Sequence, residues 1–201
     1  VTTAIGALIL WRRPGHTMGR LLAAVGVLFG ASAAISLIVA AVDPFALRFP
    51  TLTRVLTVVG EVLSTVSLIG GSLIVIVRFP TGRRTSRLGL LIEGLVGVSI
   101  GGLILGEVMP SIAATIEQTA SIPLFVAYPL AAVDVAVRYR RAASLERVQF
   151  RWLIAAATVT GVLVVLMLTV GDAWLWNAWI LSTMLPTVAI GVAVLRYRLY
   201  D

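Results

Sequence analysis

The chain has 201 residues, of which 59% are hydrophobic and 12% are charged, and its mean hydropathy is +1.03. Soluble domains carry roughly a quarter charged residues, so this composition excludes an ordinary water-soluble fold and indicates a protein of the lipid bilayer. The net charge of +7 comes from Arg without any Lys, and because the arginines flank apolar segments, nucleic-acid binding is excluded as well. With no Cys and a single His, the chain has neither disulfides nor the ligands for a zinc site.

Seven apolar segments follow one another along the chain, and we predict that each is a transmembrane helix. The first, residues 1–11, would rise only about 16 Å as a helix, so we expect a partial span that belongs to a longer chain. Six full spans are predicted at residues 19–42, 52–77, 88–108, 122–137, 152–170 and 176–195. Because these runs lack the alternation of a transmembrane barrel, the predicted fold is an all-α polytopic bundle, a single membrane-embedded domain over residues 1–201.

Proline and glycine refine this prediction. Pro123, Pro129 and Pro186 lie inside the fifth and seventh predicted spans, where each removes a backbone donor, so we expect kinks there. Gly-xxx-Gly patterns that begin at Gly26, Gly97 and Gly102 let helix backbones approach closely. They predict close packing within the bundle, with dimerisation as the alternative.

Arginine predicts the orientation. Fourteen of the sixteen arginines follow the first, third, fifth and seventh segments, and the other gaps hold only Arg48 and Arg54. By the positive-inside rule the Arg-rich side is cytoplasmic, which places the C-terminus inside a bacterial cytoplasmic membrane. An aromatic belt is expected on the outer side, formed by Trp174, Trp176 and Trp179.

Carboxylates within the apolar segments are the candidate sensing residues. Glu61, Glu93 and Asp134 are costly to bury when ionised, whereas Glu107 lies at the outer end of its span and is expected to be solvated. Asp134 can pair with Arg138 one helical turn away. Glu61 and Glu93 have no opposite charge within one turn, so each is expected to be protonated or to face a polar cavity, as a sensing residue or as a hydrogen-bonded structural one.

Four segments on the Arg-rich side share a pattern with a known family. They are RRPGHTMGRLL at residues 12–22, FPTGR at 79–83, LERVQFRWL at 145–153 and LRYRLYD at 195–201. In this order they resemble the N-terminal membrane region of actinobacterial-type sensor histidine kinases, with patterns near RRPxNPIGWLL, FPDGRLPS, ERxQLRWL and LRYRLYDID. The resemblance covers almost the whole chain. His16, Thr17 and Met18 replace the usual Asn-Pro-Ile, and Thr81 replaces the usual Asp, which leaves loop details open.

The resemblance implies a sensor and signal-transmitting module. Its last helix would continue into a cytoplasmic output domain after residue 201, usually an ATP-dependent histidine kinase that forms a homodimer and phosphorylates a response regulator. The final turn carries neither a Gly or Asn cap nor a Pro stop, which favours continuation. Its residues Arg196, Tyr197, Arg198 and Tyr200 are therefore the candidate signal exit.

Two other functions stay open from the sequence. Glu61 and Glu93 could line the path of a small transporter or channel, or the chain could be a membrane anchor without sensing. No Walker A or GxSxG motif occurs, so we expect no catalytic residue, cofactor or metal in this chain, and the lipid bilayer as its first partner.

Overall fold

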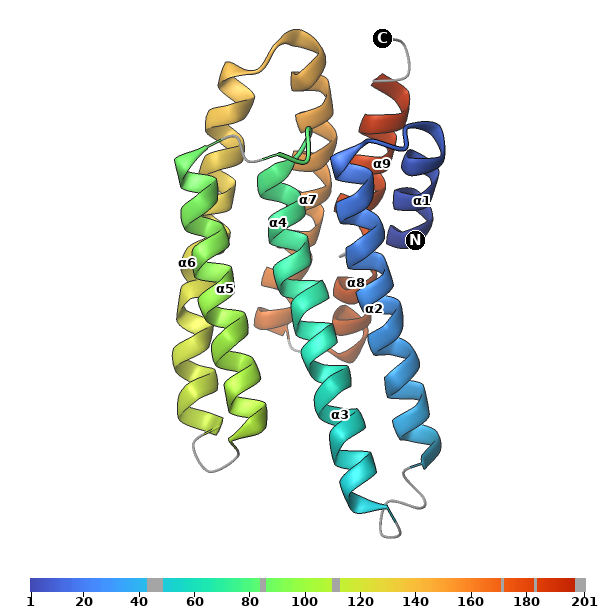
Figure 1. Ribbon diagram of the computed structural model, residues 1–201. Helices are drawn as coiled ribbons and strands as arrows, with labels where there is room; N and C mark the ends of the chain where they lie inside the picture. The colour runs from blue at the N-terminus through green and yellow to red at the C-terminus, as the bar shows by residue number, and fades with distance from the viewer. Residues whose placement is uncertain (43–48, 84–85, 110–112, 171, 183, 198–201) are drawn as a thin grey trace. The chain divides into compact units, whose positions relative to one another are not determined.

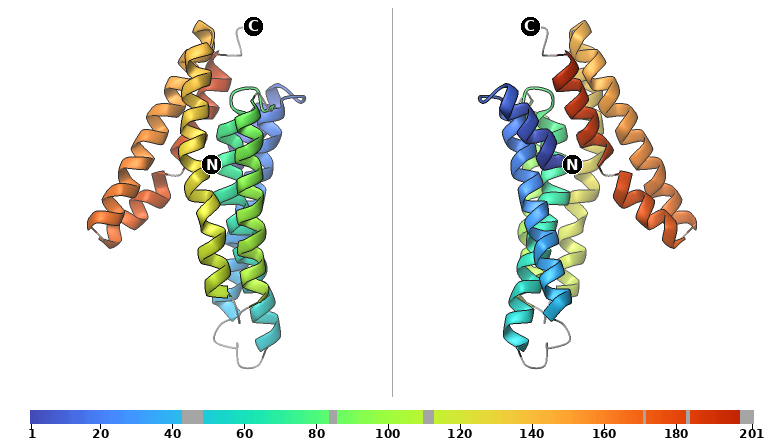
Figure 2. Two further views of the ribbon diagram at one scale, coloured as in Figure 1. Left: turned by 90° about the vertical axis from the view of Figure 1, so that its left-hand side faces the viewer. Right: turned by 90° about the vertical axis from the view of Figure 1, so that its right-hand side faces the viewer.

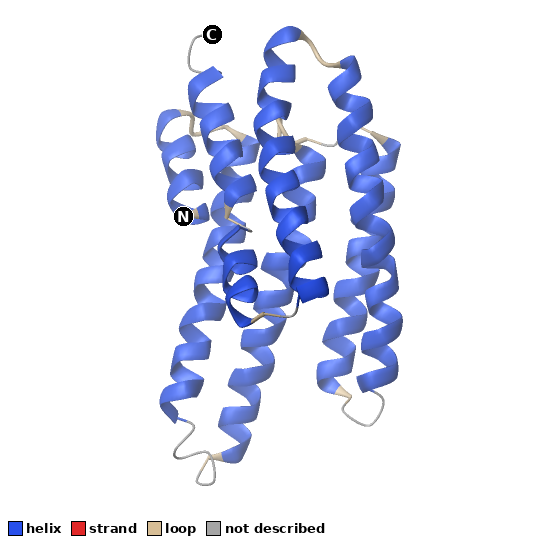
Figure 3. Cartoon of the chain, turned by 180° about the vertical axis from the view of Figure 1, so that it is seen from behind, coloured by secondary structure: helices blue, strands red, loops and turns tan. Residues whose placement is uncertain are grey.

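The computed structural model describes residues 1–42, 49–83, 86–109, 113–170, 172–182 and 184–197, and these form helices joined by short loops, with no strand among them (Figures 1 and 3). The elements are α1 (Thr2–Arg12), α2 (Thr17–Val42), α3 (Pro50–Thr65), η2 (Val66–Gly71), α4 (Ser72–Arg78), α5 (Arg87–Val108), α6 (Ala113–Arg141), α7 (Ser144–Val170), α8 (Ala173–Ser182) and α9 (Leu185–Tyr197). The all-α prediction is confirmed.

Among the described residues, four helical stretches are long and apolar enough to cross a membrane. They are Thr17–Val42, Pro50–Arg78, Arg87–Glu107 and Ile122–Arg141. A helix that crosses a bilayer needs about 20 predominantly apolar residues. These stretches are 26, 29, 21 and 20 residues long. They correspond to the second, third, fourth and fifth predicted spans, and the full count of six spans with a partial first span stays a prediction.

The third predicted span is one helical rod with a π-helical insert. The rod runs from α3 through η2 to α4 without a break, and the insert holds Gly70 and Gly71 (Figure 1). A Cβ on Gly71 would lie 2.7 Å from Val25 of α2, and one on Gly70 would lie 2.4 Å from Ile100 of α5. The missing side chains therefore let two neighbouring helices approach the rod closely where its winding changes.

Proline has different effects in the two helical regions where kinks were expected. The predicted seventh span forms two helices, α8 and α9, instead of one kinked helix, and Pro186 lies in the first turn of α9, where its missing N–H leaves no helical bond unmade. By contrast, α6 continues through Pro123 and Pro129 and begins at Ala113, well before the predicted residue 122. The fifth predicted span is thus the C-terminal part of one longer helix.

The chain divides into two compact units. The first comprises Val1–Ala23, Phe79–Arg83 and Val135–Asp201, and the second comprises Ala24–Arg78 and Arg84–Asp134. In the first unit α7 packs along α8 and α9, and α1 packs on α9 (Figure 2). A Cβ on Gly6 would lie 2.4 Å from the backbone nitrogen of Ala23, so α1 also packs tightly on the start of α2.

The second unit has its core between α4, α5 and α6. The buried apolar side chains are Leu73, Val77, Ile92, Val96, Leu124, Ala127 and Ala131. On the other side of the rod, Ser32 Oγ of α2 donates a hydrogen bond of 3.0 Å to the carbonyl oxygen of Gly60. Small residues and a buried hydroxyl at this contact are the means by which helices associate in hydrocarbon, where burial of apolar surface gives no driving force.

Candidate functional site

Glu93, one of the three predicted sensing residues, forms an ion pair with Arg78 at the end of α4. Arg78 Nε donates to Oε1 at 2.6 Å and Nη2 donates to Oε2 at 3.0 Å. The side chains are 8% exposed for Glu93 and 24% exposed for Arg78. This two-point geometry joins α4 to α5 and is the strongest arrangement that an Arg and a carboxylate can adopt. The partner lies fifteen positions away in the sequence, beyond the reach of helical spacing.

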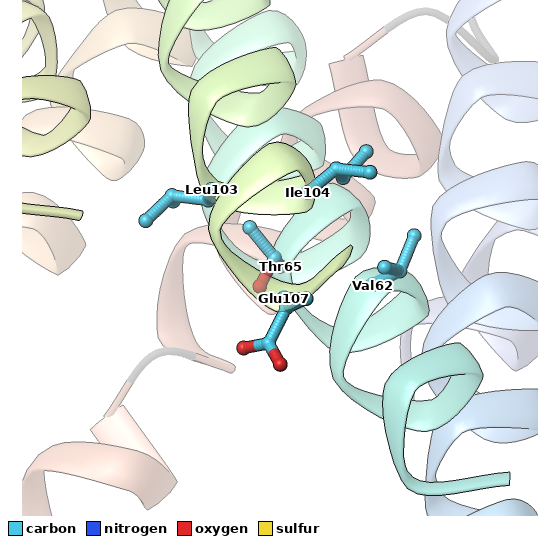
Figure 4. Close-up of a pocket in the computed structure, with 5 residues that line it drawn as sticks. All are labelled: Val62, Thr65, Leu103, Ile104 and Glu107. Carbon is cyan, nitrogen blue, oxygen red and sulfur yellow. The ribbon is translucent and has the colours of Figure 1, made fainter. Parts of the chain in front are cut away.

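Glu61, the second predicted residue, meets another carboxyl group. The side chain of Glu107 on α5 lies within hydrogen-bonding reach of Glu61 on α3. Beside this contact is a cavity of about 120 Å³ lined by Val62 and Thr65 of α3 and by Leu103, Ile104 and Glu107 of α5 (Figure 4). Glu107 was expected only to be solvated, and its position opposite Glu61 makes it part of the candidate site.

Asp134, the third, is 2% exposed and is bound to the start of α5. Ser86 Oγ donates to Asp134 Oδ1 at 2.7 Å and accepts at 2.8 Å from the N–H of Gly89. One hydroxyl therefore caps α5 and ties it to α6. The predicted pairing of Asp134 with Arg138 stays a prediction, while Arg138 Nη1 donates to the carbonyl oxygen of Phe79.

Phe79 is the centre of an aromatic contact in the first unit. It is fully buried, and its ring meets that of Phe150 edge to face with the centroids 5.5 Å apart and the planes at 87°. The Arg138 guanidinium carbon lies 5.5 Å from the centroid of the Phe150 ring. Edge-to-face rings and a guanidinium over a ring are both favourable, so α6, α7 and the segment after α4 are held together here.

The end of the same segment packs against the start of α2. Gly82 has φ +77°, a conformation that glycine adopts without strain, and a Cβ there would lie 2.5 Å from the backbone nitrogen of Met18. Thr17 and Met18 are thus the residues that Gly82 touches. Gly82 can be replaced only with backbone movement.

Gln149, next to Phe150 on α7, connects the Phe79–Phe150 contact to α9. Its Nε2 donates to the carbonyl oxygen of Ala193 at 3.4 Å, and both residues are buried. Among the candidate exit residues, Arg196 and Tyr197 form the last turn of α9, and Arg198 and Tyr200 lie outside the described residues.

Three of the four segments that carry the family resemblance therefore meet in one unit. Thr17 and Met18 represent the first segment, Phe79 and Gly82 the second, and Phe150 the third. The fourth lies at the end of α9 and continues beyond the described residues. We call the contacts of Phe79, Gly82, Arg138, Gln149 and Phe150 the motif cluster.

No protein-family model, curated protein or solved structure matches the chain. The class of protein therefore comes from the fold: an all-helical membrane protein with four membrane-length helices in the described part. No group of three or more metal-ligating side chains occurs among the described residues. The contacts described above are ion pairs, hydrogen bonds and helix packing.

Proposed function

We propose that the chain is the transmembrane sensor and signal-transmitting module of a two-component sensor histidine kinase. A stimulus in the membrane or at its outer face would shift the packing of the helices, and the last helix would pass that shift to a cytoplasmic output domain. The observation that carries the proposal is the motif cluster, because within the first unit it links Phe79 to α9 through Phe150 and Gln149.

The connection is short and physically continuous. Arg78 ends the rod, and the next residue, Phe79, is buried against Phe150. Gln149 precedes Phe150 on α7 and bonds the backbone of α9. Within the first unit, a displacement of Phe79 would therefore reach α9 through one ring contact, the peptide bond between Gln149 and Phe150, and one hydrogen bond. A preference of a few kcal/mol between two arrangements of such a bundle is enough for a switch.

The proposed topology has six full spans and a partial first span, with the Arg-rich ends in the cytoplasm of a bacterium. The arginine distribution supports it, since the gaps after the first, third, fifth and seventh segments hold fourteen of sixteen arginines. The motif cluster lies within these Arg-rich segments, beside the proposed exit of the signal. A dimeric kinase output and a response regulator are part of the same proposal.

Phase insertion tests the proposal. One to four alanines are inserted after Asp201 in the whole protein that the gene encodes, and autophosphorylation with ATP is measured in proteoliposomes. A helix turns about 100° per residue, so two inserted residues should change the output most and four should nearly restore it. An output that is the same for all four insertions contradicts transmission through the last helix.

A second variant tests the motif cluster itself. Gln149→Leu removes the hydrogen bond to Ala193 and keeps most of the side-chain volume, so we expect the fold to survive and the output to change several-fold. Thr158→Val is the matched control, because Thr158 Oγ1 donates its hydrogen bond within α7, to the carbonyl oxygen of Ile154. Equal outputs for the two variants would remove Gln149 from the route.

A transporter or channel with Glu61 and Glu93 along its path is the alternative. Arg78 engages both oxygens of Glu93, which weakens the case for Glu93 as an ion ligand. Flux in proteoliposomes that is lost in Glu61→Gln would favour the alternative, and unchanged flux would leave the sensor proposal as the better account.

A further inference from the structure

Exposed arginines gather where α6 ends and α7 begins. The two helices are joined by Ala142 and Ala143, and the exposed residues on either side are Arg140, Arg141, Arg147 and Arg151. Over residues 138–151 the sequence has a single acidic residue, Glu146. This short segment therefore presents a concentrated positive charge, which we call the arginine turn.

Two of these guanidinium groups are held in place by the protein. Arg147 Nε donates to the carbonyl oxygen of Ala142 at 2.9 Å, and Arg151 Nε donates to the hydroxyl of Tyr139 at 3.4 Å. The hydrogen bond to Tyr139 raises the pKa of Arg151 above its ordinary value. Each guanidinium uses one edge on the protein, and its Nη groups are the donors available to a partner.

The arginine turn lies at the end of a membrane-length helix. The apolar stretch of α6 ends at Arg141, and Trp152 follows Arg151 directly and is 42% exposed. Exposed tryptophan next to arginine is typical of the boundary between hydrocarbon and headgroups. Beyond Trp152, Ile154 is also exposed, so the same face changes from charged to apolar within one helical turn.

We infer that the arginine turn binds the phosphate headgroups of anionic phospholipids, through Arg147 and Arg151. A planar guanidinium donates to two phosphate oxygens at once, and fixing Nε beforehand reduces the freedom lost on binding. Trp152 and Ile154 then contact the part of the acyl chains that lies next to the headgroup. A soluble phosphate would satisfy the arginines but leave this apolar surface uncovered, and for that reason the lipid is the better partner.

Lipid binding to the detergent-solubilised chain tests the inference independently of any signalling role. Phosphatidylglycerol and phosphatidylcholine with the same acyl chains are titrated separately and followed by native mass spectrometry. One double variant changes Arg147 and Arg151 to Gln, and a second changes the same two residues to Lys. The matched control is Arg54→Gln, since Arg54 is an exposed arginine on α3. Circular dichroism checks that each variant is helical.

We expect the wild-type chain to prefer phosphatidylglycerol, and the double Gln variant to bind it about 25-fold more weakly, roughly fivefold for each arginine. The double Lys variant should lie in between, because it keeps the charge and loses the fixed fork. Arg54→Gln should bind within about twofold of wild type. If the double Gln variant loses helicity, the single variants apply the same test at about fivefold each.

Two results overturn the inference. One is equal binding of both lipids, or of phosphatidylglycerol to wild type and the double Gln variant. The other is displacement of phosphatidylglycerol by inorganic phosphate at matched concentrations, which would assign the arginine turn to a soluble phosphate ligand.

Discussion

Glu93 and Glu107 lie on the same helix, α5, and both meet the same rod, but their partners carry opposite charges. Glu93 is held by Arg78 at the end of α4, whereas Glu107 faces Glu61 on α3. The first contact attracts at any pH at which the carboxylate is ionised. The second attracts only when a proton lies between the two carboxyl groups and repels when both are ionised.

The two ends of α5 therefore have different properties. The Arg78–Glu93 pair is a structural clasp next to the buried core of the second unit. The Glu61–Glu107 contact borders a cavity and involves an exposed Glu61, so its strength can respond to the surroundings. The proposed sensor function would use both contacts, a stable one at Glu93 and a variable one at Glu107.

Breaking the clasp should have the largest effect. Arg78→Gln leaves the nearly buried Glu93 carboxylate without its bidentate partner, and we expect a loss of about 2–4 kcal/mol in stability, less than for a wholly buried pair because Arg78 is 24% exposed. The measurement is loss of helical circular dichroism on titration of the detergent-solubilised chain with sodium dodecyl sulfate. Arg54→Gln is the control. Equal unfolding curves for the two variants would show that the Arg78–Glu93 pair does not stabilise the fold.

Exchanging the charges of the clasp should recover part of that loss. In the double variant Arg78→Glu with Glu93→Arg the attraction returns with altered geometry, so we expect a favourable coupling energy of about 1–2 kcal/mol. The same unfolding titration on both single variants and the double variant completes the cycle. A coupling energy near zero would mean that the two side chains act separately.

Giving the Glu61–Glu107 contact opposite charges, like those of the Arg78–Glu93 pair, should stabilise the second unit. Glu107→Arg places opposite charges on α3 and α5, and because Glu61 is exposed we expect a gain of only about 0.5–1 kcal/mol in the same titration. Adding Glu61→Gln should abolish the gain. A gain that persists in this double variant would come from something other than the contact with Glu61.

The smallest effect concerns protons. Two ionised carboxylates repel, and protonating Glu107 removes the repulsion, so the α3–α5 contact should tighten as the pH falls. Spin labels at Val59→Cys and Leu105→Cys are unique because the chain has no Cys, and double electron–electron resonance then reports their separation. We expect a narrower distance distribution at mildly acidic pH in wild type and no such change in Glu107→Gln. A pH response that survives in Glu107→Gln would contradict the role of this pair.

The sequence was a good guide to helices and a poor guide to partners. Apolar runs located the four membrane-length stretches to within a few residues, although α6 itself begins at Ala113, because hydrocarbon demands continuous apolar length and satisfied backbone groups. Of the candidate residues, Glu61, Glu93 and Asp134 were found by their polarity, but Arg78, Glu107 and Ser86 were missed as their partners. These partners come from other helices, where spacing along one helix gives no information.

What the sequence by itself determined is the solvent and the units of construction: an all-helical chain in a bilayer, with its arginines concentrated at alternate ends of the apolar segments. Only the tertiary structure decided that Glu93 meets an arginine while Glu107 meets another glutamate, and that Phe79 packs on Phe150. The physical reason is that helix formation depends on neighbours along the chain, whereas pairing between helices depends on their mutual rotation and depth.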